Sequence, residues 1–168
     1  MRVRDGVSLR AATGEDLQGV VAVGHRTWPA TYIPIAGKDY VAMGLAKWWT
    51  ADATIPAIRA GRVTVAEIGD EIVGMTSVGP LDGHLVLWKL YVVPELQGSG
   101  VGGMLLRAAI ARATADEYDE LRLSYLDGND GARGFYEHHG FEVFDRDEGG
   151  EIPDSIWMRL QLKGSTDG

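Results

Sequence analysis

The stretch Gln97-Gly98-Ser99-Gly100-Val101-Gly102-Gly103 lies between an apolar strand-like segment, Leu85–Val93, and an apolar helix-like segment, Met104–Ala115. Its glycines can turn tightly, adopt positive φ and let backbone N–H groups approach a ligand without intervening side chains. Because the helix begins inside this stretch, its unpaired N–H groups and the positive end of its dipole point into the loop. The sequence therefore predicts an anion site between this strand and this helix.

Three phosphate-binding motifs contain glycines at similar spacings, and the neighbouring residues distinguish them. A P-loop requires Lys and then Ser or Thr after the last glycine, but Met104-Leu105 stands there. The dinucleotide fingerprint G-x-G-x-x-G is matched by residues 98–103, and Asp127 follows the next strand, as a ribose-binding acid would. However, Pro94–Gln97 separates the strand from the first glycine, and too little chain follows for a dinucleotide fold. A nucleotide-binding oxidoreductase is therefore the less favoured reading.

The third motif, Gln/Arg-x-x-Gly-x-Gly/Ala, is matched by residues 97–102. This match resembles the acyl-CoA diphosphate loop of the GNAT superfamily of N-acetyltransferases. The segment Leu90–Pro94 resembles that family's central strand and turn. The residues that resemble the family's C-terminal signature are Asn129, Phe135-Tyr136 and Gly140-Phe141. The specific resemblance covers residues 84–144, and the remainder of the chain agrees in element order alone.

The resemblance implies an α/β fold with a mixed, mostly antiparallel sheet of about six to seven strands, helices on both faces, and a splay between two parallel central strands. The residue patterns favour helices at 13–26, 38–50, 101–118 and 129–138, and strands at 8–11, 63–67, 72–78, 84–93, 121–126, 141–145 and 155–162. Trp28-Pro29 is expected to end the first helix, because proline disfavours helical geometry in the residue before it. Residues 30–37 would then form a loop.

Length and composition limit the domain organisation and the partners. The 168 residues, 45% of them hydrophobic, suit one domain, for which we expect residues 1–163, with a disordered tail at 164–168. The net charge of −8 argues against nucleic acid and anionic membrane surfaces as partners. Without cysteine or zinc-ligand spacing of histidines, no metal site is expected. The N-terminus lacks the apolar run of a signal peptide, which favours a cytoplasmic location.

The resemblance also implies acetyl-CoA as the co-substrate. Its pantetheine arm would complete the unpaired strand edge formed by Leu90, Tyr91 and Val92, as an added strand does. Its diphosphate would bind the loop residues Gln97, Gly98, Ser99, Gly100, Val101, Gly102 and Gly103. The loop itself contains no Lys or Arg, so backbone dipoles would supply most of the binding, and Arg107 is the nearest following cation.

Two residues of the C-terminal signature are the candidates for chemistry. Asn129 is placed to cap the helix that follows it, and the resemblance adds a hydrogen bond to the pantetheine region. Tyr136 lies seven residues later, two helical turns along the same face. In the family, the tyrosine at this position gives a proton to the departing thiolate, a role that a phenol can fulfil. Packing beside Phe135 is the structural alternative for Tyr136.

The acceptor side is less well defined by the sequence. Trp28 and Tyr32 are expected to line the acceptor pocket, although packing between helices and sheet would equally explain them. Many GNAT enzymes carry a glutamate at the position of Ser124, and the neighbouring strand offers Lys89 instead of a carboxylate. No general base is assigned, because a water chain that removes the amine's proton could end at any of four residues: Glu67, Asp82, His84 or Asp127.

The predicted activity is transfer of an acetyl group to a primary amine by direct attack through a tetrahedral intermediate, stabilised by the Val92 N–H. The acceptor would be a small-molecule or peptide amine, and a homodimer is left open. The missing carboxylate and the uncharged loop favour an alternative, a non-catalytic CoA-binding sensor or inactive homologue. Acceptor identity cannot be read from the sequence.

Overall fold

The computed structural model describes residues 6–162 of the chain, so the tail predicted at 164–168 lies outside the described residues. The α-helices are α1 (Leu17–Ala36), α2 (Lys38–Trp48), α3 (Ala51–Arg59), α4 (Val101–Ala115) and α5 (Asp130–His138). The strands are β1 (Val7–Ala11), β2 (Val63–Ile68), β3 (Glu71–Leu81), β4 (His84–Val92), β5 (Glu120–Leu126), β6 (Glu142–Asp147) and β7 (Ser155–Gln161).

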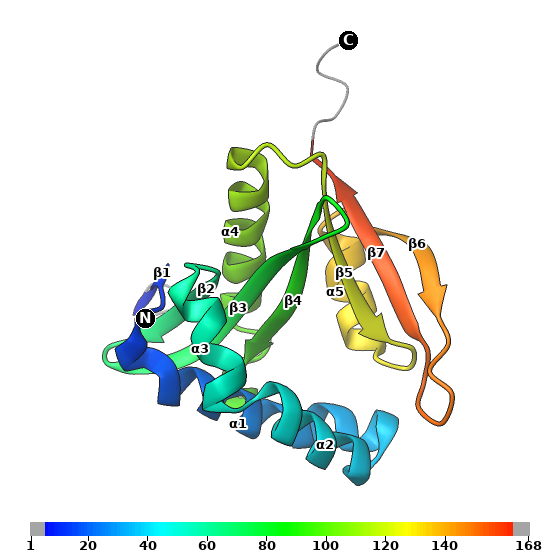
Figure 1. The fold of residues 1–168 in the computed structure, drawn as a ribbon, viewed down its shortest axis with the longest axis horizontal. Helices are drawn as coiled ribbons and strands as arrows, with labels where there is room; N and C mark the ends of the chain where they lie inside the picture. The colour runs from blue at the N-terminus through cyan, green and yellow to red at the C-terminus, as the bar shows by residue number, and fades with distance from the viewer. Residues whose placement is uncertain (1–5, 163–168) are drawn as a thin grey trace.

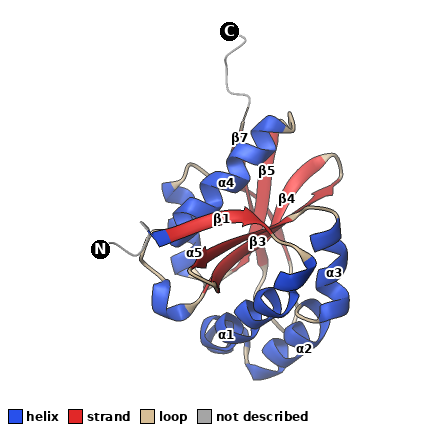
Figure 2. Ribbon diagram, turned by 90° about the vertical axis from the view of Figure 1, so that its left-hand side faces the viewer, coloured by secondary structure: helices blue, strands red, loops and turns tan. Residues whose placement is uncertain are grey.

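The strands form one seven-stranded sheet in the order β1-β2-β3-β4-β5-β7-β6. Among the strands of residues 6–162, β4 and β5 are the only neighbours that run parallel, and the helix α4 makes the crossover between them. Helices α4 and α5 lie on one side of the sheet, and α2 and α3 lie on the other (Figure 2). The predicted α/β architecture with helices on both faces is confirmed.

The parallel strands β4 and β5 separate after a short contact. Their register contains only the pairs Leu85 with Leu121 and Val86 with Arg122. Beyond these pairs the strands diverge toward the end of the sheet where α1 runs (Figure 1). The splay predicted between two parallel central strands is therefore present, and it leaves the later part of β4 without a strand partner on that side.

The prediction that Trp28-Pro29 ends the first helix is wrong. Helix α1 continues to Ala36 with Pro29 and Pro34 inside it. A proline in a helix interior costs about 3 kcal/mol through a lost hydrogen bond and a clash with the preceding turn. Tertiary packing offsets that cost, because Trp28 is only 5% exposed and stacks against Tyr40 of α2. The predicted loop at 30–37 is consequently the last helical turns of α1 and the residue that caps them.

Two tryptophans fix the helical layer by occupying the space above two glycines. The Trp28 ring of α1 lies over Gly44 of α2, where a Cβ atom would be 2.1 Å from its Cζ3. The Trp49 ring, just after α2, lies over Gly24 of α1, where a Cβ would be 1.9 Å from its Cδ2. Each helix thus supplies a glycine for the other segment's tryptophan. This reciprocal packing holds α1 and the end of α2 close to the exposed part of the splay.

Candidate active site

The glycine-rich loop opens directly into α4. Gly98 has φ 83° and Gly100, the N-cap residue, has φ 98°, which L-residues with a side chain rarely adopt. The first four N–H groups of a helix have no partner inside it, so the N–H groups at the start of α4 are directed toward the loop. Gln97, before the turn, donates from its Nε2 to the Val92 carbonyl at 3.1 Å, tying the loop to the end of β4.

Positive charge lies closer to this helix tip than the loop sequence suggests. Arg107 folds back along α4, with its Nη1 3.1 Å from the position that a Gly103 Cβ would occupy. The Nε2 of His139, from the end of α5, is 3.7 Å from the same point. A side chain at Gly103 would displace the guanidinium, so the glycine makes room for a cation. The residues present therefore fit a diphosphate through backbone amides assisted by Arg107.

The edge of β4 beside the splay carries backbone groups without a strand partner, although the Val92 carbonyl accepts from Gln97 Nε2. Val93 N–H donates to Val73 of β3 at 2.9 Å, and backbone groups alternate in direction along a strand. Leu90 and Val92 therefore direct their N–H and C=O groups toward β5, whereas Tyr91 directs its own toward β3. A chain with amide groups can pair with Leu90 and Val92 at this edge. Tyr91, the third residue predicted there, contributes its side chain instead.

Asn129 and Tyr136 occupy one helix across the splay from β4. Asn129 is the N-cap of α5, and its Oδ1 accepts from the Ala132 N–H at 3.3 Å. Tyr136 packs its ring against Phe135 and Phe141, with centroid distances of 5.3 and 5.8 Å. Desolvation on burial raises the pKa of Tyr136 well above its usual range, and the nearby Tyr32 phenol adds to the effect. Tyr136 is therefore protonated at neutral pH and can donate a hydrogen bond.

Three tyrosines from α1, β4 and α5 lie close together. The Tyr32 hydroxyl of α1 and the Tyr91 hydroxyl of β4 are hydrogen-bonded at 2.9 Å. Burial raises the pKa of Tyr91 well above its usual range, and the phenols of Tyr32 and Tyr136 act in the same direction. All three hydroxyl groups thus lie near one another and are protonated. The side-chain role of Tyr91 was missed in the sequence, although period-two alternation from Val93 indicates the face on which it lies.

Comparison with known proteins agrees with this geometry. The family model of the GNAT acetyltransferase domain matches residues 59–143. A probable N-acetyltransferase of Mycobacterium tuberculosis is 30% identical over 144 residues, which make up 82% of this chain and 80% of that protein. The chain belongs to the GNAT family of acetyltransferases. It is an acyltransferase with the mixed, splayed sheet that this family shares.

Two further proteins are similar to this chain. An L-methionine sulfoximine/L-methionine sulfone acetyltransferase of Pseudomonas paraeruginosa is 29% identical over 150 residues, covering 81% of this chain and 80% of that one. The crystal structure of the PaiA N-acetyltransferase of Thermoplasma acidophilum, solved with coenzyme A, superposes with a TM-score of 0.84. That structural match covers 92% of this chain and 98% of the other at 21% identity, and so it supports the fold.

The two residues predicted to line the GNAT acceptor pocket differ in their surroundings. Tyr32 directs its hydroxyl to Tyr91, at the mouth of the splay. Trp28 is buried, with Tyr32 at 4.7 Å on one side and Gly44 on another. The structure therefore places Trp28 in the packing between α1 and α2, behind Tyr32.

Four residues were considered as the end of a proton path: Glu67, Asp82, His84 and Asp127. None of them places a free carboxylate beside the three tyrosines. Glu67 is paired with Arg10 at 2.9 Å, and Asp127 is exposed and paired with Arg146 at 3.4 Å. Asp82 and His84 lie at the β3–β4 turn, about 20 Å along the strand from Tyr91. Ser124 is exposed on β5 opposite Trp157. The structure therefore places none of these four candidates as a free carboxylate beside Tyr32, Tyr91 and Tyr136.

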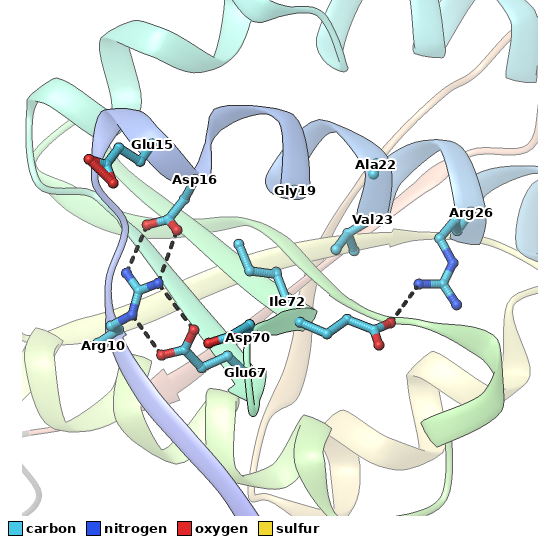
Figure 3. A pocket seen from close by; sticks show the side chains of 11 residues that line it. Arg10, Glu15, Asp16, Gly19, Ala22, Val23, Arg26, Glu67, Asp70 and Ile72 are labelled. Carbon is cyan, nitrogen blue, oxygen red and sulfur yellow. Dashed lines mark hydrogen bonds and ion pairs between the residues drawn. The ribbon is translucent and has the colours of Figure 1, made fainter.

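A separate hollow of about 370 Å³ lies between the start of α1 and the β1–β3 side of the sheet (Figure 3). Arg10 crosses it and donates to Asp16 at 2.8 and 2.9 Å and to Glu67 at 2.9 and 3.2 Å. The Arg10 hydrogen bonds lower the pKa of Asp16 to about 2, in spite of an opposing desolvation effect. These paired charges join β1, β2 and the start of α1, and we assign them to stability.

The Asp16 pairing predicts a pH dependence of folding stability. A carboxyl group whose folded pKa is about 2, below its ordinary 3.8, stabilises the fold above pH 4 and loses that contribution as the pH falls toward 2. We expect Asp16→Asn to lower the free energy of unfolding at pH 6 by roughly 1 to 2 kcal/mol, allowing for solvent around Arg10. Urea unfolding at pH 6 and pH 3 should show a smaller difference between variant and wild type at pH 3. Asp70→Asn, in the same hollow, should change neither value, and a constant Asp16→Asn deficit would contradict the linkage.

Two classes of site do not occur among residues 6–162. No helix there is long and apolar enough to cross a membrane. Within the same range, no three His, Asp or Glu side chains are grouped as metal ligands would be.

Proposed function

We propose that this chain transfers the acetyl group of acetyl-CoA to the amine of a small molecule, with Tyr136 as the proton donor to the leaving thiolate. The observation that carries the proposal is the combination of an unpaired β4 edge and an anion-binding helix tip at the end of the same strand. The related PaiA structure contains coenzyme A, and the related Pseudomonas enzyme acts on amino acid derivatives. Both support a CoA thioester as donor and a small amine as acceptor.

Each part of the site has a distinct task in binding. The N–H groups at the start of α4, with Arg107 beside them, would hold the diphosphate. Leu90 and Val92 would pair with the pantetheine amides, which leaves the thioester near the phenols of Tyr91 and Tyr136. Asn129 already uses its side-chain oxygen as a helix cap, so its amide NH₂ is the group that could reach pantetheine.

The chemical step requires one bond to form and one to break. Acetyl-CoA supplies a thioester, whose carbonyl carbon accepts the lone pair of the acceptor amine. The Val92 N–H, which has no strand partner toward β5, would stabilise the oxyanion that develops. When the carbon–sulfur bond breaks, Tyr136 gives its proton to the thiolate, and the proton that the amine loses returns through solvent to the Tyr136 phenolate. The raised pKa keeps Tyr136 in its protonated form at neutral pH, which is the form that the leaving thiolate requires.

A CoA-binding sensor without catalysis is the second candidate, and the absence of a carboxylate beside the tyrosines favours it. Thermal unfolding with acetyl-CoA, CoA and NAD separates cofactor classes, since a ligand that binds only the folded state raises the midpoint. At 100 times its dissociation constant, acetyl-CoA should raise the midpoint by roughly 5 to 10 °C, and NAD should leave it unchanged. Thiol release with amines then separates enzyme from sensor. Stabilisation without thiol release from any amine would favour the sensor.

A further inference from the structure

The three grouped tyrosines supply more hydrogen-bond donors than the protein around them uses. Tyr32 of α1 and Tyr91 of β4 share one hydrogen bond of 2.9 Å between their hydroxyl groups. Among residues 6–162, no other group bonds to the Tyr32 hydroxyl, and none accepts a hydrogen bond from the Tyr136 hydroxyl. One hydrogen bond uses one proton, so two of the three phenol protons have no acceptor in this part of the chain.

The direction of the hydrogen bond between Tyr32 and Tyr91 follows from Trp28. The Trp28 Nε1–H is buried and has no partner in hydrogen-bonding geometry among the described residues. Burial raises the pKa of Tyr91, and this N–H lies close enough to the phenol to oppose that rise. An indole N–H can only donate, so it meets the Tyr91 oxygen and leaves the Tyr91 proton for Tyr32.

The pKa of Tyr32 agrees with this direction. Burial raises the pKa of Tyr32, and the hydrogen bond with Tyr91 lowers it, as a bond received by a phenol oxygen does. The Tyr32 hydroxyl thus accepts from Tyr91 and directs its own proton elsewhere. A desolvated donor without an acceptor is costly. Tyr32 is therefore prepared to donate to an oxygen or sulfur atom of a ligand.

The free donors of Tyr32 and Tyr136 lie close to each other. Tyr32 influences the pKa of Tyr136 after burial, and both phenols influence that of Tyr91. In a thioester, the sulfur and the carbonyl oxygen are bonded to the same carbon, so two neighbouring donors can reach both atoms. With Tyr136 assigned to the sulfur, the carbonyl oxygen is the acceptor atom left for Tyr32.

A backbone donor for the same oxygen lies on β4. The Val92 N–H follows Tyr91 directly in the chain and has no strand partner toward β5. Sites that stabilise an oxyanion combine backbone N–H groups with side-chain donors, tyrosine among them. Tyr32 of α1 and Val92 of β4 therefore form a two-donor arrangement contributed by two elements.

We propose that Tyr32 donates a hydrogen bond to the thioester carbonyl oxygen and, with the Val92 N–H, stabilises the oxyanion formed during transfer. Tyr32 is then a catalytic residue, and Tyr91 is a positioning residue that fixes the direction of the Tyr32 proton. This inference rests on the proposed function for the transfer step, but the contact with the carbonyl group can be tested without transfer.

The kinetic test removes one hydroxyl group at a time and keeps each ring. Tyr32→Phe should lower kcat by about 100-fold, the lower end of the loss expected from one oxyanion donor. KM for acetyl-CoA and for the amine should each change less than threefold, because the bond strengthens in the transition state. Tyr91→Phe keeps the Tyr32 hydroxyl but not its alignment, so kcat should fall by roughly three- to tenfold, about the value of one neutral hydrogen bond.

Tyr40→Phe is the matched control for loss of a phenol beside the same rings. The Tyr40 ring stacks on Trp28 at 5.6 Å and lies 6.2 Å from the Tyr32 ring. Its hydroxyl forms no hydrogen bond among residues 6–162. The Tyr40→Phe enzyme should therefore retain full kcat.

The test without turnover is isotope-edited infrared spectroscopy of bound acetyl-CoA with a carbon-13-labelled carbonyl group, recorded without an amine. A hydrogen bond to a carbonyl oxygen weakens the carbon–oxygen double bond and lowers its stretching frequency. The carbonyl band should lie at higher wavenumber in Tyr32→Phe than in the wild type. Tyr40→Phe should give the wild-type band, and a purely structural role for Tyr32 would not move it.

The same carbonyl band in Tyr32→Phe and wild type would overturn the inference, even where thiol release proceeds. Unchanged kcat in Tyr32→Phe, or a raised KM for the amine with unchanged kcat, would overturn it as well, since the second pattern indicates contact with the acceptor alone. A band shift in a protein that releases no thiol with any amine would support the Tyr32 contact and count against the proposed transfer. The two proposals therefore fail by different observations.

Discussion

Replacing Tyr136 with phenylalanine is expected to lower kcat for thiol release by about 100-fold, the lower end of what a positioned proton donor contributes. The ring contacts with Phe135 and Phe141 need no hydroxyl group, so folding should be retained. The proposed acetyl-CoA contacts lie on β4, on α4 and at Asn129, so KM for acetyl-CoA should change by less than threefold. Steady-state kinetics at saturating acceptor measures both quantities.

Tyr125→Phe is the control for loss of a phenol elsewhere in the same sheet. Tyr125 lies on β5, and the charged groups that influence its pKa, after desolvation, are Arg133, Glu137, Asp127 and Arg146. It therefore faces a different environment from the three grouped tyrosines, and its variant should retain full turnover. A Tyr136→Phe enzyme with unchanged kcat would refute the proton-donor role.

Replacing Gly24 with alanine is expected to give the largest loss of stability. The new Cβ would lie 1.9, 2.2 and 2.5 Å from three atoms of the Trp49 ring. That ring is 1% exposed and is held by Tyr91 at 5.4 Å and by Lys89, so it has little room to move. Overpacking of this kind costs about 3 kcal/mol, which exceeds the roughly 1 kcal/mol that alanine gains over glycine in a helix. Thermal unfolding should show a midpoint about 5 to 10 °C lower.

The matched control is the same substitution at Gly134, inside α5. A Cβ there would meet no atom within 4 Å, so only the helix propensity changes. Gly134→Ala should therefore be stabilised by up to about 1 kcal/mol, opposite in sign to Gly24→Ala. If Gly24→Ala were as stable as Gly134→Ala, the reciprocal tryptophan–glycine packing would not be a determinant of the helical layer.

The sequence was most informative where a local rule and the tertiary structure agree. Around residues 84–144, the strand, the glycine turn and the helix start follow from residue type alone, and α5 ends before Gly140 at φ 94°. Helix α3 was not predicted, although Thr50 caps it with a 3.1 Å bond from the Ala53 N–H and Arg59 lies in its last turn. Pro56 inside the helix obscured those signals.

Other features depend on contacts between distant segments and could not be read locally. Helix α1 passes Pro29 because burial of Trp28 outweighs a local preference. That extension brings Tyr32 to Tyr91, which are 59 residues apart in sequence. The sequence indicates Arg107 as the nearest following cation. It does not show that the Arg107 side chain folds back toward Gly103, because that depends on the side-chain conformation. The sequence thus predicts residues for the CoA side of the site more completely than for the acceptor side.

The central claim is that backbone amides at the start of α4 hold a diphosphate while the gap between β4 and β5 admits the pantetheine arm. A crystal structure with bound acetyl-CoA tests it most directly. The account predicts diphosphate oxygens within 3.2 Å of N–H groups in residues 98–103, the usual limit of an N–H···O bond, and pantetheine amides paired with Leu90 and Val92. A diphosphate bound elsewhere, or β4 and β5 paired along their whole length in the complex, would contradict it.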